Sequence, residues 1–307
     1  MSFEVETVGI VGAGLMGTGI AEVCALAGYP TVLVKATPGN AASALDRVRA
    51  SLAARVQKGK LAADVADAAL ARIQATTDRA AVVDCSLVIE SIVEDLIAKR
   101  ELFAELAPRL APQAVLATNT STLKVGDLAA SIREARTIGL HFFSPVPAMA
   151  LVEIAHTAGT DADVVPAAER FVGRLGKSPV PVLDSTGFVV NRLLVPLLLN
   201  AIQAYGQGLA TAEQIDTAMR LGCGHPLGPL ALADLIGLDV VYAMAKLLYQ
   251  EFKDACYRPP ALLRRLVQEG HLGKKTGRGL YDYRTRPPVP NEEIWHLIRG
   301  RSLHAAA

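Results

Sequence analysis

Short apolar runs alternate with longer amphipathic stretches through the first half of the chain. The apolar runs cover residues 5–11, 31–34, 86–90, 115–118, 138–140 and 151–154. Between them, stretches such as residues 18–26 and 96–106 carry apolar side chains at helical spacing. Short strands that alternate with helices predict an α/β domain built on a mostly parallel sheet.

Residues 38–74 interrupt this alternation and are typical of a helical hairpin. The first arm covers residues 40–58, a turn follows at Gly59, and the second arm covers residues 62–74. Basic side chains are frequent on the first arm. They fit a solvated helix face or a handle for a phosphorylated ligand, and the charges alone favour the solvated face.

The second half of the chain loses the alternation of strands and helices. Residues 188–205 and 231–252 are apolar on too many faces for a surface helix, which indicates burial against another helix or another subunit. We therefore expect a first domain over residues 1–184 and an all-helical second domain over residues 185–307. Residues 284–307 form a proline-rich linker, a short amphipathic segment and a tail to which the sequence assigns no function.

Composition narrows the class of protein. The 307 residues are 51% hydrophobic and 20% charged with a net charge of +1, which is typical of a packed protein without a field for nucleic acid or an anionic membrane. No apolar run is long enough to cross a bilayer, and the acidic start lacks a signal-peptide core. The cysteines lack metal-ligand spacing, so we expect reduced, mostly buried thiols, no metal site and a cytoplasmic location.

A glycine-rich turn follows the first apolar run and opens the first helical stretch. Its residues are Gly12, Ala13, Gly14, Leu15, Met16 and Gly17. Strand, GxGxxG and helix in this order are the context of a dinucleotide-binding turn, in which the helix N-terminus receives the pyrophosphate. The turn therefore predicts a Rossmann-like domain that binds a nicotinamide dinucleotide.

The residue at the end of the second apolar run is unusual for such a domain. An acid normally follows the glycine turn by about 20 residues and binds the ribose hydroxyls. Here Lys35 stands 23 positions after Gly12. A lysine can pair with the 2′-phosphate of NADP, or it can be an exposed lysine tolerated beside NAD, and both readings stay open.

A histidine and a glutamate frame the turn between two apolar runs. His141 stands where its strand ends, Pro145 and Pro147 force a non-helical turn, and Glu153 lies in the next extended run. An imidazole that donates one nitrogen to a carboxylate presents the other as a base. The alternative is a histidine satisfied by backbone beside an unrelated acid.

Polar residues also follow the run at 115–118, beginning with Asn119 and ending with Thr122. The carboxyl ends of parallel strands are where open α/β sheets bind ligands, so we expect Asn119 on the cofactor side. An ordinary Ser/Thr turn is the alternative, and these residues by themselves favour it.

Several blocks together give the chain a family resemblance. It resembles the 3-hydroxyacyl-CoA dehydrogenases, especially the short stand-alone 3-hydroxybutyryl-CoA type, from about Val8 to Tyr283. The matching blocks are GAGLMGTGIA, VIESIVEDLIAKRELF, TNTST, GLHFFSPVP followed by LVE, GFVVNRLLVPLL, HPLGP and LGKKTGRGLYDY. Chance produces such a series in one order far less often than any single block.

The resemblance implies a reaction and its catalytic residues. The family oxidises a 3-hydroxyacyl-CoA to a 3-ketoacyl-CoA with NAD(P), and His141 and Glu153 match its catalytic pair. Ser121 and Asn191 match residues near the 3-oxygen or the thioester carbonyl of the substrate. The expected substrate is a short-chain (3S)-3-hydroxyacyl-CoA, and the expected assembly is a homodimer formed through the second domain.

The resemblance also implies the ligand contacts. It assigns Glu94 and Lys99 to the cofactor site, with Lys275 reaching that site from the second domain, and it assigns Ser51 and Lys58 to coenzyme A. With this assignment the basic side chains of the hairpin read as partners for the phosphates of the ligand.

Two positions depart from the family pattern. Lys35 replaces the usual acid, and Ser144 replaces an asparagine on the nicotinamide side, three residues after the histidine. A hydroxyl is shorter than a carboxamide and has fewer donors. Coenzyme choice therefore stays open, and so do acyl chain length and two alternatives: a related dehydrogenase acting on acyl-carrier-protein substrates, and a non-catalytic nucleotide-binding homologue.

Overall fold

The computed structural model describes residues 3–130 and 132–302. The chain divides into two compact units, Met1–Phe188 and Val189–Ala307. Each unit has its own apolar core.

An eight-stranded sheet forms the centre of the first unit. The strands are β1 (Val8–Val11), β2 (Thr31–Val34), β3 (Ile73–Thr76), β4 (Leu87–Glu90), β5 (Val115–Thr118), β6 (Thr137–Phe142), β7 (Leu151–His156) and β8 (Ser178–Leu183). Their order is β3-β2-β1-β4-β5-β6-β7-β8, and only the β6–β7 pair is antiparallel. The order reverses between β1 and β4, and such a switch point opens a ligand crevice at the carboxyl ends of the strands.

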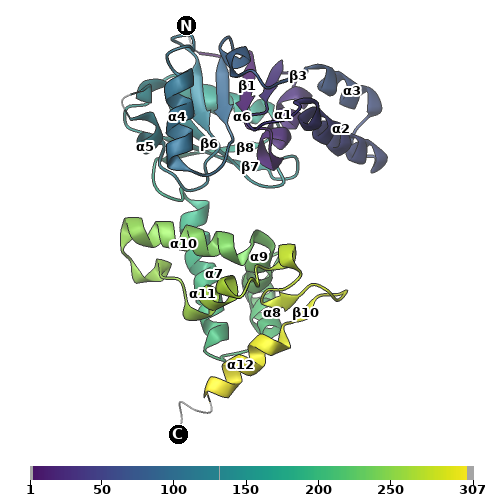
Figure 1. Ribbon diagram of the computed structural model, residues 1–307, viewed down its shortest axis with the longest axis vertical. Helices are drawn as coiled ribbons and strands as arrows, with labels where there is room; N and C mark the ends of the chain where they lie inside the picture. Colours follow the sequence, from purple (N-terminus) through teal and green to yellow (C-terminus); the bar gives the residue numbers. More distant parts are fainter. Residues whose placement is uncertain (1–2, 131, 303–307) are drawn as a thin grey trace. The chain divides into compact units, whose positions relative to one another are not determined.

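Helices cover both faces of this sheet (Figure 1). One face packs against α1 (Leu15–Leu26), α2 (Ala42–Gln57), α3 (Ala63–Ala71) and α6 (Val164–Arg174), and the other packs against α4 (Leu96–Leu106) and α5 (Val125–Ala129). Strand side chains alternate between the two cores, as Ile10 and Val11 do on β1. Each fully buried aliphatic side chain contributes about 1.5–3 kcal/mol to this packing. The Rossmann-like prediction is confirmed.

The helical hairpin is also confirmed, although its second arm is shorter than expected. Ala44, Val48 and Leu52 of α2 form a buried stripe at helical spacing. The predicted second arm over 62–74 is wrong at its end, because α3 stops at Ala71 and the chain enters β3 at Ile73.

The pattern of apolar and polar residues does not predict β3, β8 or α6. Pro179 and Pro181 lie within β8, which pairs with β7 alone at the edge of the sheet. Proline is tolerated there because an edge strand has a free side that needs no donor. Its four exposed residues also lack the buried alternation that marks a half-buried strand.

The second unit is mainly helical. It contains α7 (Val190–Gly206), α8 (Ala212–Cys223), α9 (Pro229–Ile236), α10 (Leu238–Phe252), α11 (Ala261–Gln268), α12 (Glu292–Ser302) and a two-stranded ribbon of β9 (Tyr281–Asp282) and β10 (Val289–Pro290). The predicted helix over 231–252 is two helices, because Gly237 adopts φ +106° between them. Within the expected tail, α12 stacks Trp295 on Tyr205 at 5.7 Å, while residues 303–307 lie outside the described part.

Two buried aspartates organise the second unit. Asp216 accepts the N–H groups of Leu230 and Ala231 at the start of α9, at 2.8 and 2.9 Å. Asp234 accepts those of Leu280 and Tyr281, at 3.0 and 2.8 Å. Burial raises the pKa of Asp234 to about 6. These bonds join segments that are far apart in the sequence.

All four cysteines are free, but Cys223 and Cys256 are exposed, so the expectation of mostly buried thiols holds only for Cys24 and Cys85. Among the described helices, none combines the length and the apolar character needed to cross a bilayer.

Candidate active site

His141 and Glu153 form a buried pair at the end of β6 and the start of β7. The antiparallel register places them directly opposite each other, and the Nδ1 of His141 lies 2.7 Å from the Oε2 of Glu153. Both residues are buried, with 5% and 1% of their surface exposed. The short turn between the strands therefore brings together the two side chains singled out from the sequence.

Aromatic rings hold the imidazole from the sides. The ring centre of His141 lies 4.3 Å from that of Phe143 and 5.8 Å from that of Phe188. With Nδ1 facing the carboxylate, Nε2 is the nitrogen that can exchange a proton with a ligand. Because carboxylate and rings restrict rotation, the imidazole is preorganised as a base.

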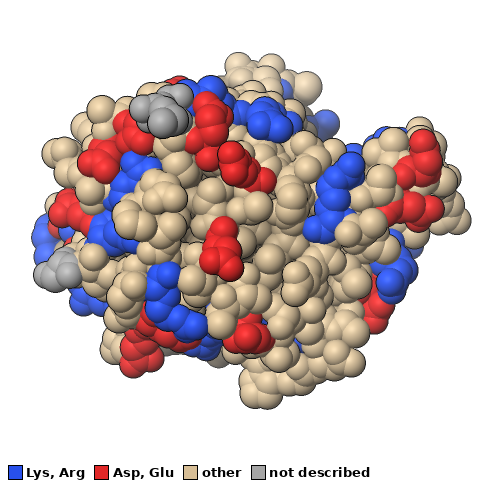
Figure 2. Space-filling view, turned by 90° about the horizontal axis from the view of Figure 1, so that it is seen from above, with Lys and Arg blue, Asp and Glu red and all other residues tan. Residues whose placement is uncertain are grey.

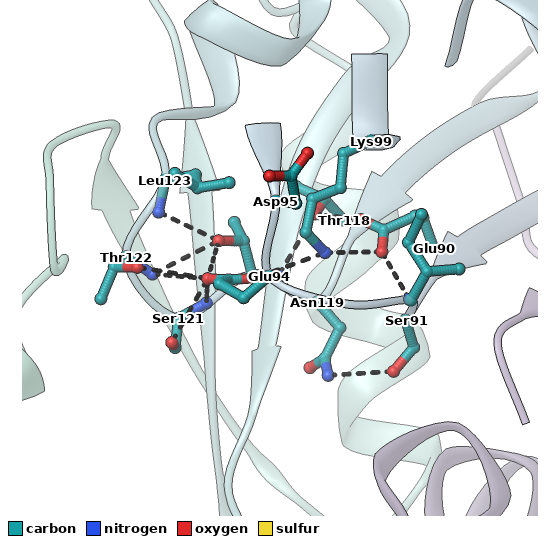
Figure 3. A network of polar contacts seen from close by, with 12 residues as sticks. Glu90, Ser91, Glu94, Asp95, Lys99, Thr118, Asn119, Ser121, Thr122 and Leu123 are labelled. Atoms are coloured by element: carbon teal, nitrogen blue, oxygen red, sulfur yellow. Dashed lines mark hydrogen bonds and ion pairs between the residues drawn. The ribbon is translucent and has the colours of Figure 1, made fainter. Parts of the chain in front are cut away.

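Glu94 is the hub of a polar network beside this pair (Figure 3). Its Oε1 accepts the hydroxyl of Thr120 at 2.5 Å and the backbone N–H groups of Ser121 and Thr122 at 3.0 and 3.3 Å. Burial works to raise the pKa of Glu94, but Lys99 and these hydrogen bonds outweigh it and leave the pKa below its ordinary value. The ionised carboxylate thus fixes the loop that carries Ser121.

Lys99 supports Glu94 from below the surface. Its Nζ lies 2.6 Å from Glu90 Oε1 and 3.3 Å from Glu94 Oε2, and only 1% of its side chain is exposed. The other oxygen of Glu90 accepts the hydroxyl of Thr118 at 2.7 Å. Lys99 therefore acts on the site through the carboxylates. Glu90 is not predicted from the sequence, because its only signal there is an acid at the end of an apolar strand.

Asn119 connects three strand ends. Its Oδ1 accepts the backbone N–H of Phe142 at 2.9 Å, and its Nδ2 lies 3.4 Å from Ser91 Oγ. Phe142 is the neighbour of His141, so the carboxamide links the β5 loop to the strand that carries this histidine. Ser144 lies in the exposed loop after β6.

The glycine turn has the shape expected of a pyrophosphate site. Gly12 adopts φ +117°, and a Cβ there would lie 2.2 Å from the carbonyl oxygen of Ser91. A Cβ on Gly17 would lie 1.7 Å from the Gly12 oxygen, whereas a Cβ on Gly14 would meet nothing within 4 Å. The turn thus packs tightly on the protein side and stays open at Gly14, beside the N-terminus of α1, where an anion can approach.

Leu15 and Met16 begin α1 directly after this turn. Leu15 is 75% exposed and Met16 is half-buried. An apolar side chain that projects from the glycine turn can cover the flat face of a bound nucleotide.

Lys35 folds back on its own loop. Its ammonium donates to the carbonyl and hydroxyl of Thr37, at 3.1 and 3.2 Å, and to the carbonyl of Pro38. These bonds shape the loop after β2, and they leave the positive charge of Lys35 in place because all three acceptors are neutral.

The remaining residues lie on α2 and in the second unit. Ser51 lies on α2 and is half-buried, and Lys58 follows the end of this helix as its C-cap residue and is exposed. Asn191 lies in the first turn of α7 and is 7% exposed. Lys275 pairs with Asp239 at 2.6 Å within the second unit. Within the first unit, the His141–Glu153 pair and the loops that carry Asn119 and Glu94 lie at the same end of the sheet, where β4, β5 and β6 end.

Charges on the face of Figure 2 are mixed, with acidic and basic side chains interspersed among uncharged ones. An anionic ligand would therefore depend on local groups such as the glycine turn. A doubly wound sheet with this turn, and a carboxylate-held histidine at the same edge, define an oxidoreductase that binds a nicotinamide dinucleotide.

Comparisons with known proteins identify the family. Residues 7–185 match the 3-hydroxyacyl-CoA dehydrogenase, NAD binding domain, and residues 187–283 match the 3-hydroxyacyl-CoA dehydrogenase, C-terminal domain. The chain belongs to the 3-hydroxyacyl-CoA dehydrogenase family, a family of NAD-binding oxidoreductases.

Similar proteins carry related names. A 3-hydroxybutyryl-CoA dehydrogenase of Mycobacterium tuberculosis is 45% identical, covering 92% of this chain and 100% of that protein. The human mitochondrial hydroxyacyl-coenzyme A dehydrogenase is 41% identical, covering 91% and 92%. The crystal structure of (S)-3-hydroxybutyryl-CoA dehydrogenase PaaH1 from Ralstonia eutropha superposes with a TM-score of 0.88 at 43% identity, covering 91% and 99%.

Proposed function

We propose that this enzyme interconverts short-chain (3S)-3-hydroxyacyl-CoA thioesters, such as 3-hydroxybutyryl-CoA, and the corresponding 3-ketoacyl-CoA thioesters. The observation that carries the proposal is the buried contact of 2.7 Å between His141 and Glu153. The names of similar relatives, 3-hydroxybutyryl-CoA dehydrogenases at 42–45% identity, support the short acyl chain.

The proposed chemistry assigns proton transfer to His141. Its Nε2 removes the proton of the 3-hydroxyl group during oxidation and returns it during reduction. Glu153, held against Nδ1, orients the ring and stabilises the imidazolium that forms. A bound nicotinamide supplies the acceptor for the hydride that leaves C3. General base catalysis of this kind contributes about 10²–10⁴-fold.

Two further residues act on the substrate oxygens in this proposal. Ser121 lies on the loop fixed by Glu94. We assign its hydroxyl to a hydrogen bond with the 3-oxygen or the thioester carbonyl. Asn191 is the second such donor, from the start of α7. Ser51 on α2 and Lys58 at its C-cap would bind coenzyme A through a hydroxyl and an ammonium.

The proposed cofactor contacts lie at the carboxyl ends of the parallel strands. The open side of the turn at Gly14 receives the pyrophosphate, and Glu94, Asn119 and Ser144 border the nicotinamide half. Lys99 contributes by holding Glu94, and Lys275 is a contact from the second unit. The family match supports NAD. Lys35 supports NADP, because a lysine at this position can pair with the 2′-phosphate.

Two alternatives remain testable. A carrier-protein substrate would use the same catalytic pair, but the names of the relatives refer to coenzyme A thioesters and do not favour it. A non-catalytic homologue has no use for a buried His141–Glu153 pair. Turnover of acetoacetyl-CoA, compared with turnover of acetoacetyl on a carrier protein, distinguishes the proposed coenzyme A dehydrogenase from these two alternatives. We expect coenzyme A to be preferred, and no oxidation of NADH or NADPH with either thioester would refute the proposal.

We also propose a cytoplasmic homodimer formed through the second unit. Large apolar side chains are exposed there, among them Leu193, Leu209, Leu221 and Leu235, with 54–79% of their surface accessible. Exposed large apolar side chains of this kind are commonly buried where subunits meet. Light scattering after gel filtration tests the dimer, and a monomer at micromolar concentration would contradict it.

A further inference from the structure

The loop after β2 lacks the group that binds the ribose of NAD. The end of β2 lies beside the glycine turn, because the N–H of Gly12 donates to the carbonyl of Val34 at 2.9 Å. From Lys35 to Leu45 the sequence contains no acid. The first acid, Asp46, is exposed and pairs with Arg49 at 2.5 Å. No carboxylate of this loop can accept hydrogen bonds from the ribose hydroxyls.

Two cations occupy the same junction. Lys35 begins the loop, and Arg47 reaches from α2 to donate to the carbonyl of Ala13 within the glycine turn. In the part of the chain that the structure describes, neither side chain forms an ion pair with an acid. Arg47 has five N–H donors, and the contact with Ala13 accounts for one of them. A guanidinium with unused donors beside a dinucleotide turn is suited to a phosphate.

We propose that this junction binds the 2′-phosphate of an adenosine, so that the coenzyme is NADP(H). Arg47 is the direct ligand and acts through a forked pair of N–H groups. Lys35 holds the loop by its bonds to Thr37 and Pro38 and adds a second positive charge nearby. The inference rests on the proposed dehydrogenase for its physiological meaning, but the phosphate site itself can be measured without turnover.

The positive charges of Lys35 and Arg47 match the negative charge of a 2′-phosphate. The 2′-phosphate adds a dianion at a position where NAD carries a neutral hydroxyl. Charge-assisted hydrogen bonds to a phosphate are roughly twice as strong as neutral ones, and a bidentate arginine adds geometric specificity. A lysine and an arginine without acidic partners attract that dianion, and they provide no acceptor for the hydroxyl.

The test is calorimetric titration of the full chain with 2′,5′-ADP and with 5′-AMP, which differ by the 2′-phosphate. We expect 2′,5′-ADP to bind at least about tenfold more tightly. Arg47→Gln should remove most of that difference and leave the affinity for 5′-AMP within about threefold. Arg49→Gln, two residues further along the same helix, is the matched control and should retain the preference.

A second variant keeps the test decisive if Arg47→Gln disturbs the glycine turn. Lys35→Asp restores an acid at the end of β2, and it should lower the affinity for 2′,5′-ADP and raise that for NADH. Equal affinities for the two nucleotides in the unchanged chain, or tighter binding of NADH than of NADPH, would overturn the phosphate site. Failure to reduce acetoacetyl-CoA with either coenzyme would instead refute the dehydrogenase proposal and leave the phosphate result standing.

Discussion

The side chain of Asn119 accepts the backbone N–H of Phe142 at 2.9 Å, one residue away from His141. This bond runs from the end of β5 to the end of β6, so a loop expected to border the cofactor also fixes the strand that carries this histidine. The position of His141 therefore depends on a contact that is distant in sequence, as well as on its own partner Glu153.

Removal of the acceptor on Asn119 should lower both stability and turnover. Asn119→Ala leaves the N–H of Phe142 without its partner, at a cost of about 1–3 kcal/mol if no water replaces the carboxamide. We expect a lower midpoint of urea unfolding and a lower kcat for acetoacetyl-CoA reduction. Asn119→Asp retains an acceptor and should lose less stability. Unchanged stability in Asn119→Ala would contradict the linking role.

The carboxylate of Glu153 should matter for rate more than for binding. Glu153→Gln keeps the shape of the side chain but removes the charge that stabilises the imidazolium, so we expect kcat to fall by about 10²-fold or more. The dissociation constant for the coenzyme, measured by fluorescence titration, should change little. A variant with nearly full kcat would show that the pair is structural.

Loss of Lys99 should be among the most damaging single changes in the first unit. Lys99→Met leaves Glu90 buried without its ammonium partner, which typically costs about 3–5 kcal/mol. The double variant Lys99→Met with Glu90→Gln should recover part of the loss. As a control, Arg79→Met breaks the exposed pair with Glu105 and should cost about 0–1 kcal/mol. Urea denaturation compares these proteins, and equal losses in the two single variants would refute the buried pair as a support.

Asp234 gives the second unit a pH dependence of defined sign. Burial raises its pKa to about 6 in the folded chain, above the value of about 3.9 expected when unfolded. The folded state therefore holds the proton more tightly, and this group's contribution to stability falls as the pH rises from about 4 to about 6. The hydroxyl of Tyr283 and the backbone N–H of Tyr281 face the same carboxyl, and Asp216, which accepts the hydroxyl of Tyr281, lies nearby.

The measurement compares the chain with Asp234→Asn in urea between pH 4 and pH 7. Asparagine cannot titrate, and it replaces one acceptor oxygen with a donor, so the variant should be less stable throughout. We expect the stability advantage of the unchanged chain over the variant to shrink as the pH rises to about 6, then to level off. An advantage that grows over this interval would contradict the raised pKa.

Local pattern predicted most of the sheet and the meeting of the two side chains His141 and Glu153. The buried strands β1, β2, β4 and β5 are continuous apolar runs, and a short turn brings His141 opposite Glu153. The pattern could not reveal β8, because Pro179 and Pro181 are permitted only by its place at the edge. Edge position is a property of the assembled sheet.

The supporting groups were harder to predict for the same reason. Lys99 was assigned to the cofactor, yet its charge lies between Glu90 and Glu94 inside the first unit. A sequence shows that an acid ends a strand, but it does not show which cation the fold will place against it. The contact of Arg47 with Ala13, which joins positions 34 residues apart, is likewise a product of tertiary packing.

The central claim is that His141 is the proton-transfer group. Its most direct test is stopped-flow reduction of acetoacetyl-CoA by the full-length His141→Gln variant, with coenzyme affinity measured on the same sample. The account predicts that the rate falls by about 10²–10⁴-fold while the coenzyme still binds. Reduction at nearly the original rate by a folded His141→Gln protein would contradict it.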